Sequence, residues 1–214
     1  MYAGSVSKTS IRIGAGAGYA GDRIPPAVEL AQHGQLDYLV FECLAERTIA
    51  LAQLERQQHP DKGFDPLLAE RMRAVLPICL EKSTRIITNM GAANPLQAGH
   101  EVLRVARELG LSGVKVAVVQ GDDVLPRLLK AGLQFSLIDR DAQLASLSDR
   151  MISANAYLGA DALLPALQTD AQVIVCGRVA DPAMFLAPLV HHFGWAANDW
   201  PQLGQGILVG HLLE

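Results

Sequence analysis

Short apolar runs alternate with longer segments of helical periodicity along this chain. Five runs are rich in β-branched residues and predict strands at residues 10–13, 38–41, 85–88, 115–119 and 173–176. Their apolar positions are continuous, which is typical of strands buried on both faces of a parallel sheet. We therefore expect an α/β domain with a mostly parallel, Rossmann-like sheet flanked by helices. A partial β/α barrel is the alternative, because its strands show the same pattern.

Three Asx-Pro pairs predict where helices begin, because Asp and Asn cap helices and proline is favoured in the first turn. The pairs are Asp65-Pro66, Asn94-Pro95 and Asp181-Pro182. An apolar stripe at helical spacing follows the first pair: Leu68, Met72, Val75 and Cys79. Pro77 lies within this stripe, and we expect it to kink or end the helix.

The domain organisation follows from the same pattern. Residues 1–203 are expected to form the α/β domain, and residues 204–214 the start of a further element that is cut short. The chain has 214 residues, of which 50% are hydrophobic and 19% charged. That length and composition suffice for a sizeable buried core.

Charge and cysteine content exclude several classes of protein. The net charge is −4 and the basic residues are scattered, which disfavours nucleic-acid binding. No apolar run reaches the roughly 18 residues of a membrane span, and the N-terminus lacks a secretory signal. Cys43, Cys79 and Cys176 lack the spacing of a zinc site and are expected to be buried free thiols. We expect a cytoplasmic protein that contacts neither membrane nor nucleic acid.

A glycine-rich stretch, residues 14–23, follows the first predicted strand. Gly16, Gly18 and Gly21 form a G-x-G-x-x-G pattern, and Glu42 ends the second strand about where a ribose-binding acid would lie. Two prolines at 25 and 26 disfavour a dinucleotide site, because the helix of that fingerprint begins inside the glycine motif. A nucleotide-dependent oxidoreductase stays an alternative.

Polar residues follow every predicted strand, and ligands of parallel α/β sheets bind at the carboxyl ends of the strands. The acids that are candidates for acid–base chemistry, or for Mg²⁺, are Asp22, Glu42, Asp122, Asp123 and Asp181. The candidates for substrate binding are Gly16, Gly18, Gly21, Arg23, Asn89, Asn94, Asn155 and Arg178. Arginine binds carboxylate or phosphate in a bidentate manner, and asparagine can hold a carbonyl or hydroxyl group.

Several of these residues have an equally good structural explanation. Asp122 and Asn94 could cap helices, and Arg23 and Arg178 could form salt bridges to the neighbouring Asp22 and Asp181. The histidines lack the spacing of metal ligands, so the sequence assigns no metal set, and it identifies no cofactor.

Long segments of the chain resemble one family. They are residues 13–23 (IGAGAGYAGDR), 36–54 (LDYLVFECLAERTIALAQL), 85–95 (RIITNMGAANP), 116–124 (VAVVQGDDV), 152–158 (ISANAYL) and 176–182 (CGRVADP). These segments are similar to the N-terminal domain of the acyclic terpene utilisation (AtuA-type) family. The resemblance implies a role in catabolism of acyclic terpenes such as citronellol and geraniol, through branched acyl-CoA thioesters and a biotin-dependent carboxylase. Members are typically longer, so the resemblance implies a shortened form; it assigns no catalytic residues.

Three functional hypotheses follow. The first is an enzyme that performs acid–base chemistry, such as hydration or lysis, on a branched acyl-CoA or carboxylate. The second is a non-catalytic subunit or scaffold, bound to a pathway enzyme or to further copies of itself. The third is the nucleotide-dependent oxidoreductase.

Overall fold

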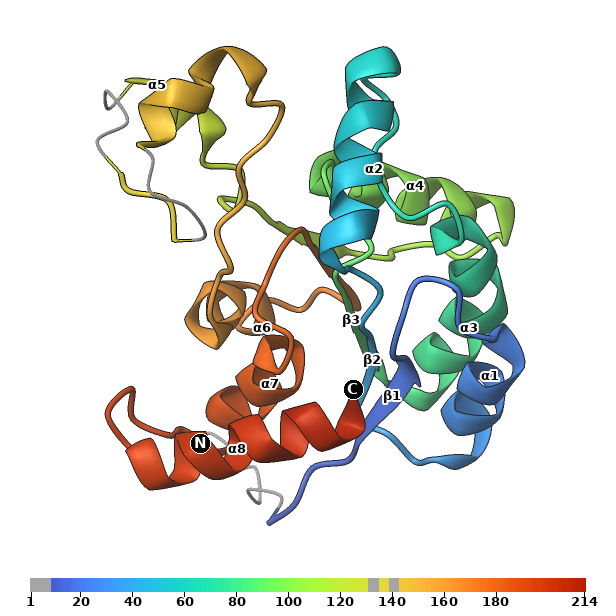
Figure 1. The fold of residues 1–214 in the computed structure, drawn as a ribbon. Helices are drawn as coiled ribbons and strands as arrows, with labels where there is room; N and C mark the ends of the chain where they lie inside the picture. The colour runs from blue at the N-terminus through green and yellow to red at the C-terminus, as the bar shows by residue number, and fades with distance from the viewer. Residues whose placement is uncertain (1–8, 131–134, 139–142) are drawn as a thin grey trace.

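The computed structural model describes residues 9–130, 135–138 and 143–214, which form a five-stranded sheet with helices on both faces (Figure 1). The strands are β1 (Ile13–Ala17), β2 (Tyr38–Phe41), β3 (Arg85–Thr88), β4 (Val116–Val119) and β5 (Val173–Cys176). All neighbouring strands are parallel, in the order β1-β2-β3-β5-β4. The predicted α/β class is confirmed, and four strands lie where the apolar runs place them, β4 beginning one residue later.

The first strand is the exception, because it begins at Ile13 and continues through the glycines to Ala17. These glycines lie under large side chains. A Cβ on Gly14 would lie 2.7 Å from the side chain of Leu30, and one on Gly16 would lie 2.6 Å from the ring of Phe41. The predicted strand at residues 10–13 is therefore wrong, because glycine here allows close packing on a strand rather than a loop.

Eight α-helices connect the strands or follow them within the described part of the chain. They are α1 (Ile24–His33), α2 (Glu46–Gln58), α3 (Leu68–Lys82), α4 (Pro95–Glu108), α5 (Leu125–Lys130), α6 (Leu164–Leu167), α7 (Ala183–Phe193) and α8 (Trp200–Leu213). Two 3₁₀ helices cover Leu144–Arg150 and Ala160–Leu163. None of these helices is both long and apolar enough to cross a membrane.

Two apolar layers enclose the sheet. On one face Leu39 and Ile86 pack against α1, α3 and α4, and on the other Val40 and Ile87 pack against α6 and α7. Right-handed crossovers explain this division. The chain moves in one direction across the sheet from β1 to β4 and then returns to β5, so the helix of the return lies on the opposite face (Figure 1).

The three Asx-Pro pairs do precede α3, α4 and α7, but their side chains bind different partners. Asp65 accepts a hydrogen bond from the backbone N–H of Leu67 at 2.7 Å, just before α3 begins. Asn94 donates to the carbonyls of Pro60 and Lys62, in the loop between α2 and α3, instead of capping α4. Asp181 accepts a hydrogen bond from Arg178 at 2.7 Å. The pairs therefore mark helix starts correctly, while tertiary contacts decide what each side chain binds.

Of the two effects expected of Pro77, a kink or an end of the helix, the end is not found, because α3 continues to Lys82. Val75, Leu76 and Cys79 are fully buried around this proline. Their burial offsets the one backbone hydrogen bond that proline removes. All three cysteines are buried free thiols, as predicted. The predicted boundary at residue 204 falls within α8, which packs against α7.

Gly91 lies where the loop after β3 packs closely against the end of β5. A Cβ at this position would lie 2.4 Å from the carbonyl oxygen of Cys176, which is backbone and cannot move aside. We expect Gly91→Ala to lower the free energy of unfolding by about 2 kcal/mol in urea titrations. Gly204→Ala is the matched control, because nothing lies within 4 Å of its added methyl group within α8. The free energy of unfolding of Gly204→Ala should rise by up to about 1 kcal/mol. Equal stability of the two variants would contradict the close approach of Gly91 to Cys176.

Candidate functional site

A polar pocket lies at the carboxyl ends of β1, β2 and β5. It is a cavity of about 310 Å³ between the loop after β1, the first turn of α2 and the segment after β5. Its polar lining includes Glu42, Glu46, Arg178, Asp181 and Glu214, together with the backbone of Gly18. Four of the predicted site residues, Gly18, Glu42, Arg178 and Asp181, therefore line this pocket.

Glu42 is buried, and its carboxyl group is fixed through one oxygen. Oε1 accepts hydrogen bonds from Asn89 Nδ2 at 2.6 Å and from the backbone N–H of Leu44 at 3.3 Å. Asn89 is itself held, because its Oδ1 accepts the N–H of Cys43 at 2.7 Å. Within the described residues Oε2 has no hydrogen-bond partner, so it is the oxygen available to a ligand.

The surroundings of Glu42 favour its protonated form. Burial raises the pKa of this carboxyl above its usual range, while the hydrogen bonds from Asn89 and Leu44 oppose the shift. The nearby carboxylates of Glu214 and Asp181 raise the pKa further. A carboxyl group with a raised pKa holds its proton to a higher pH than an ordinary glutamate, which makes it a better candidate for a general acid.

Arg178 contributes a buried positive charge to the same pocket. Its Nη1 donates to the carbonyl of Leu44, and its Nη2 donates to Asp181 at 2.7 Å. Its Nε is buried and has no hydrogen-bond partner among the described residues. The predicted salt bridge to Asp181 is therefore present, and it coexists with a place in the pocket wall.

Tyr157 and Glu46 cover Arg178 from the solvent side. The guanidinium carbon of Arg178 lies 4.1 Å from the centre of the Tyr157 ring, a cation–π contact. The Tyr157 hydroxyl donates to Glu46, and this hydrogen bond is the main cause that lowers the pKa of Glu46. Neither residue belongs to the predicted set, although Tyr157 lies two positions after Asn155.

Asp122 and Asn155 hold the backbone of the pocket residue Arg178 in place. Asp122 Oδ2 accepts hydrogen bonds from the backbone N–H of Arg178 and from Asn155 Nδ2, both at 2.9 Å. Asn155 also accepts from Gln53 of α2 at 3.3 Å. These contacts join the ends of β4 and β5 to α2, so both residues position Arg178 without lining the cavity.

The other predicted residues lie apart from the pocket or have structural partners. Asp22 accepts the N–H groups of Gly18 and Arg23, and the Gly18 bond is the largest cause that lowers its pKa. Arg23 is exposed. Asp123 accepts the N–H of Leu125 at 3.3 Å. Asn94, as described above, holds the loop between α2 and α3.

The glycine motif lacks the geometry of a dinucleotide fingerprint. Gly16 lies within β1, and α1 begins at Ile24, beyond Gly21. The helix N-terminus that would face a pyrophosphate is therefore displaced from the motif. Gly18 instead contributes backbone to the polar pocket.

Three acidic side chains lie close enough together to bind one cation. One oxygen from each of Glu42, Asp181 and Glu214 lies within 4.8 Å of the others, a spacing at which carboxylates can share a divalent ion. Asp122 and Asp123, the adjacent pair in the sequence, do not belong to this group.

A second, apolar pocket of about 450 Å³ adjoins the polar pocket. The two share four lining residues, from the loop after β1, the end of β2 and the first turn of α2: Ala20, Cys43, Leu44 and Thr48. Arg71 of α3, fully buried behind this shared wall, donates to the carbonyls of Ala20 and Asp22, both at 2.9 Å. Nothing in the sequence distinguishes Arg71 except its place beside an apolar stripe.

Comparison with known proteins places the chain in a family. Searches of curated proteins and of solved structures found no match. The family model described as acyclic terpene utilisation family protein AtuA matches residues 11–214, a span that includes every residue of both pockets. The chain therefore belongs to the acyclic terpene utilisation family, AtuA.

Proposed function

We propose that this protein is an enzyme that acts on a branched, terpene-derived carboxylate or its CoA thioester, with Glu42 as the acid–base group. The observation that carries the proposal is the geometry of Glu42. Its carboxyl group is buried, held through Oε1 by Asn89, raised in pKa, and faces the polar pocket through Oε2. A group fixed in this way is suited to move a proton at the carbon next to a carbonyl, as in hydration or lysis.

Arg178 supports the same reaction class. A buried guanidinium beside the acid can bind a carboxylate or polarise a carbonyl oxygen. Tyr157 restricts the guanidinium to one orientation by stacking on it. The pocket thus offers a proton-transfer group and a positive charge in the lining of one small cavity.

The adjoining apolar pocket supports an aliphatic substrate. Its walls include Leu44, Leu51, Phe64 and Met90, and it shares Cys43 and Leu44, the two residues that follow Glu42, with the polar pocket. A ligand with a polar head and a branched hydrocarbon chain fits two pockets of this kind better than a purely polar metabolite does. Buried free thiols fit the reducing cytoplasm as its location.

A binding screen tests the proposal. Geranic and citronellic acids, and their CoA thioesters, should raise the melting temperature of the whole chain, since a ligand at about 100 times its Kd adds about 2.7 kcal/mol. Succinate, which has no hydrocarbon chain, is the matched control and should produce no shift. Absence of a shift with every branched acid and thioester would contradict the proposal.

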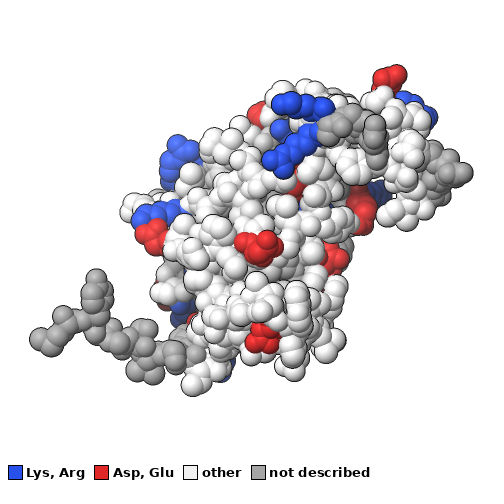
Figure 2. Space-filling view, turned by 90° about the vertical axis from the view of Figure 1, so that its left-hand side faces the viewer, with Lys and Arg blue, Asp and Glu red and all other residues white. Residues whose placement is uncertain are grey.

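One surface favours the alternative of a subunit or scaffold. Trp200, Leu208 and Leu212 of α8 are 72%, 60% and 77% exposed. The lower part of the face seen in Figure 2, near α7 and α8, shows few charged side chains. Such a surface suits contact with a pathway enzyme or a second copy of the chain. A monomer by light scattering, with no partner in pull-downs, would remove this alternative.

A further inference from the structure

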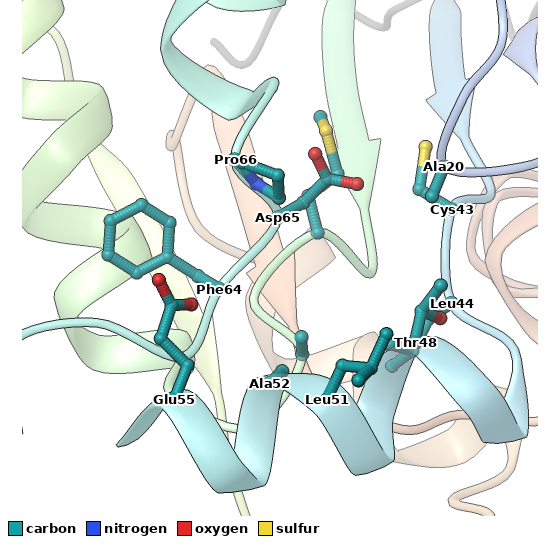
Figure 3. Close-up of a pocket in the computed structure, with 12 residues that line it drawn as sticks. Ala20, Cys43, Leu44, Thr48, Leu51, Ala52, Glu55, Phe64, Asp65 and Pro66 are labelled. Carbon is teal, nitrogen blue, oxygen red and sulfur yellow. The ribbon is translucent and has the colours of Figure 1, made fainter. Parts of the chain in front are cut away.

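The apolar pocket contains one buried carboxyl group that the proposed acid–base chemistry does not use. Asp65 lies in the segment before α3 and is 7% exposed. Figure 3 shows its carboxyl group directed into the pocket, toward Cys43. The surrounding walls are mainly hydrocarbon, from Phe64, Leu51 and Ala52.

Only one of the two oxygens of Asp65 has a partner in the described part of the chain. Oδ1 accepts the N–H of Leu67 at 2.7 Å, which fixes the orientation of the carboxyl group. Oδ2 has no hydrogen bond to any described residue. Solvent reaches Oδ2, because this oxygen is not among the fully buried atoms without a partner. A ligand that displaces water from Oδ2 without supplying a donor leaves the oxygen unpaired, at a cost of about 1–3 kcal/mol, whereas a ligand with a donor avoids that cost.

The charge near Asp65 indicates which donor would fit. Burial is the largest effect on the pKa of Asp65 and raises it, while the N–H of Leu67 and the nearby Arg71 guanidinium lower it. Because that guanidinium already opposes the negative charge, a second cation is not required. A neutral hydroxyl group on an otherwise aliphatic molecule matches both the free oxygen and the hydrocarbon walls.

We propose that Asp65 is a specificity-determining residue that selects aliphatic ligands carrying a hydroxyl group on the chain. The inference rests on the proposed function, because it assumes one substrate that occupies both pockets. The carboxylate or thioester lies in the polar pocket, and the hydroxylated chain lies in the apolar pocket. Both pockets are lined by Cys43, Leu44 and Thr48, so a single molecule that occupies both would lie along this shared wall.

A matched pair of small probes tests the role of Asp65. 1-Octanol and heptyl methyl ether have the same number of heavy atoms, but only the alcohol can donate a hydrogen bond. At a pH well above the pKa of Asp65, located from the chemical shift of its carboxyl carbon, the wild-type protein should bind octanol about tenfold more tightly in ligand-observed NMR titrations. Equal affinity for the two probes would overturn the proposal.

Asp65→Asn is the informative variant, because its Oδ1 still accepts the N–H of Leu67 while Nδ2 replaces the free acceptor with a donor. Both probes can accept from that donor, so the preference for octanol should disappear. A tenfold preference that survives in this variant would also overturn the proposal. Ala52→Leu narrows the pocket, so it should lower the affinity for both probes without changing the ratio of the two affinities. Unchanged affinities would show that the probes bind elsewhere and would refute the site.

The same experiment separates this inference from the proposed function. The octanol preference does not depend on Glu42, so Glu42→Gln should retain it. If Glu42→Gln keeps full turnover and the protein prefers octanol to the ether, the proposed chemistry fails and the assignment of Asp65 stands. If Glu42→Gln is inactive and the preference is absent, the assignment fails and the proposed chemistry stands.

Discussion

Arg71→Met is expected to lower the free energy of unfolding by about 3 kcal/mol, the largest loss of stability that the structure predicts. The guanidinium is 1% exposed and donates to the carbonyls of Ala20 and Asp22. Methionine fills similar space but leaves both carbonyls without this donor. Urea titration gives the change, and hydrogen exchange should show faster exchange in the loop at residues 18–22.

Arg73→Met is the matched control on the same helix. Arg73 is exposed and pairs with Glu108 at 3.0 Å, an interaction worth at most about 1 kcal/mol. If the two variants lose equal stability, or if exchange in the loop is unchanged in Arg71→Met, then Arg71 does not anchor the glycine loop that forms one wall of the polar pocket.

Glu42→Gln is expected to reduce turnover about 100-fold for a substrate identified by the binding screen, because the variant cannot transfer a proton. Glutamine keeps an oxygen that can accept from Asn89 and Leu44, so affinity for the ligand should change little. A fall in kcat with a nearly constant KM is the expected signature. Glu29→Gln, at an exposed carboxyl group of α1, should leave turnover unchanged.

The stability of the Glu42→Gln variant supplies a second test through its pH dependence. The pKa of Glu42 is raised in the folded state above the ordinary value of 4.5. The folded wild type therefore loses stability as the pH rises from 4.5 through that raised pKa, since its buried carboxyl group must ionise. The variant lacks this loss, so its stability relative to wild type should increase over the same interval and then level off. A constant difference would show that Glu42 has an ordinary pKa.

Glu42, Arg178 and Asp181 could be predicted because the carboxyl ends of parallel strands share one edge of a sheet. The sequence predicts the position of these residues at the sheet edge better than it predicts what each side chain binds. Arg178 forms the expected salt bridge and also lines the pocket, because Asp122 at the end of β4 holds its backbone. Asp22 has the same local sequence signal, yet its oxygens bind neighbouring backbone N–H groups.

The α/β class, four of the strands and the starts of three helices follow from the sequence, since they depend on local periodicity and on residues next to one another in the chain. The tertiary structure alone decided the strand order and the position of β1, where Leu30 and Phe41 pack on glycines. It also decided the partners of the buried charged groups. Asn89 meets Glu42 across 47 positions, and Asp65 reaches the apolar pocket only because α3 packs against the sheet. Contacts of such long range depend on how the layers pack, which local pattern does not encode.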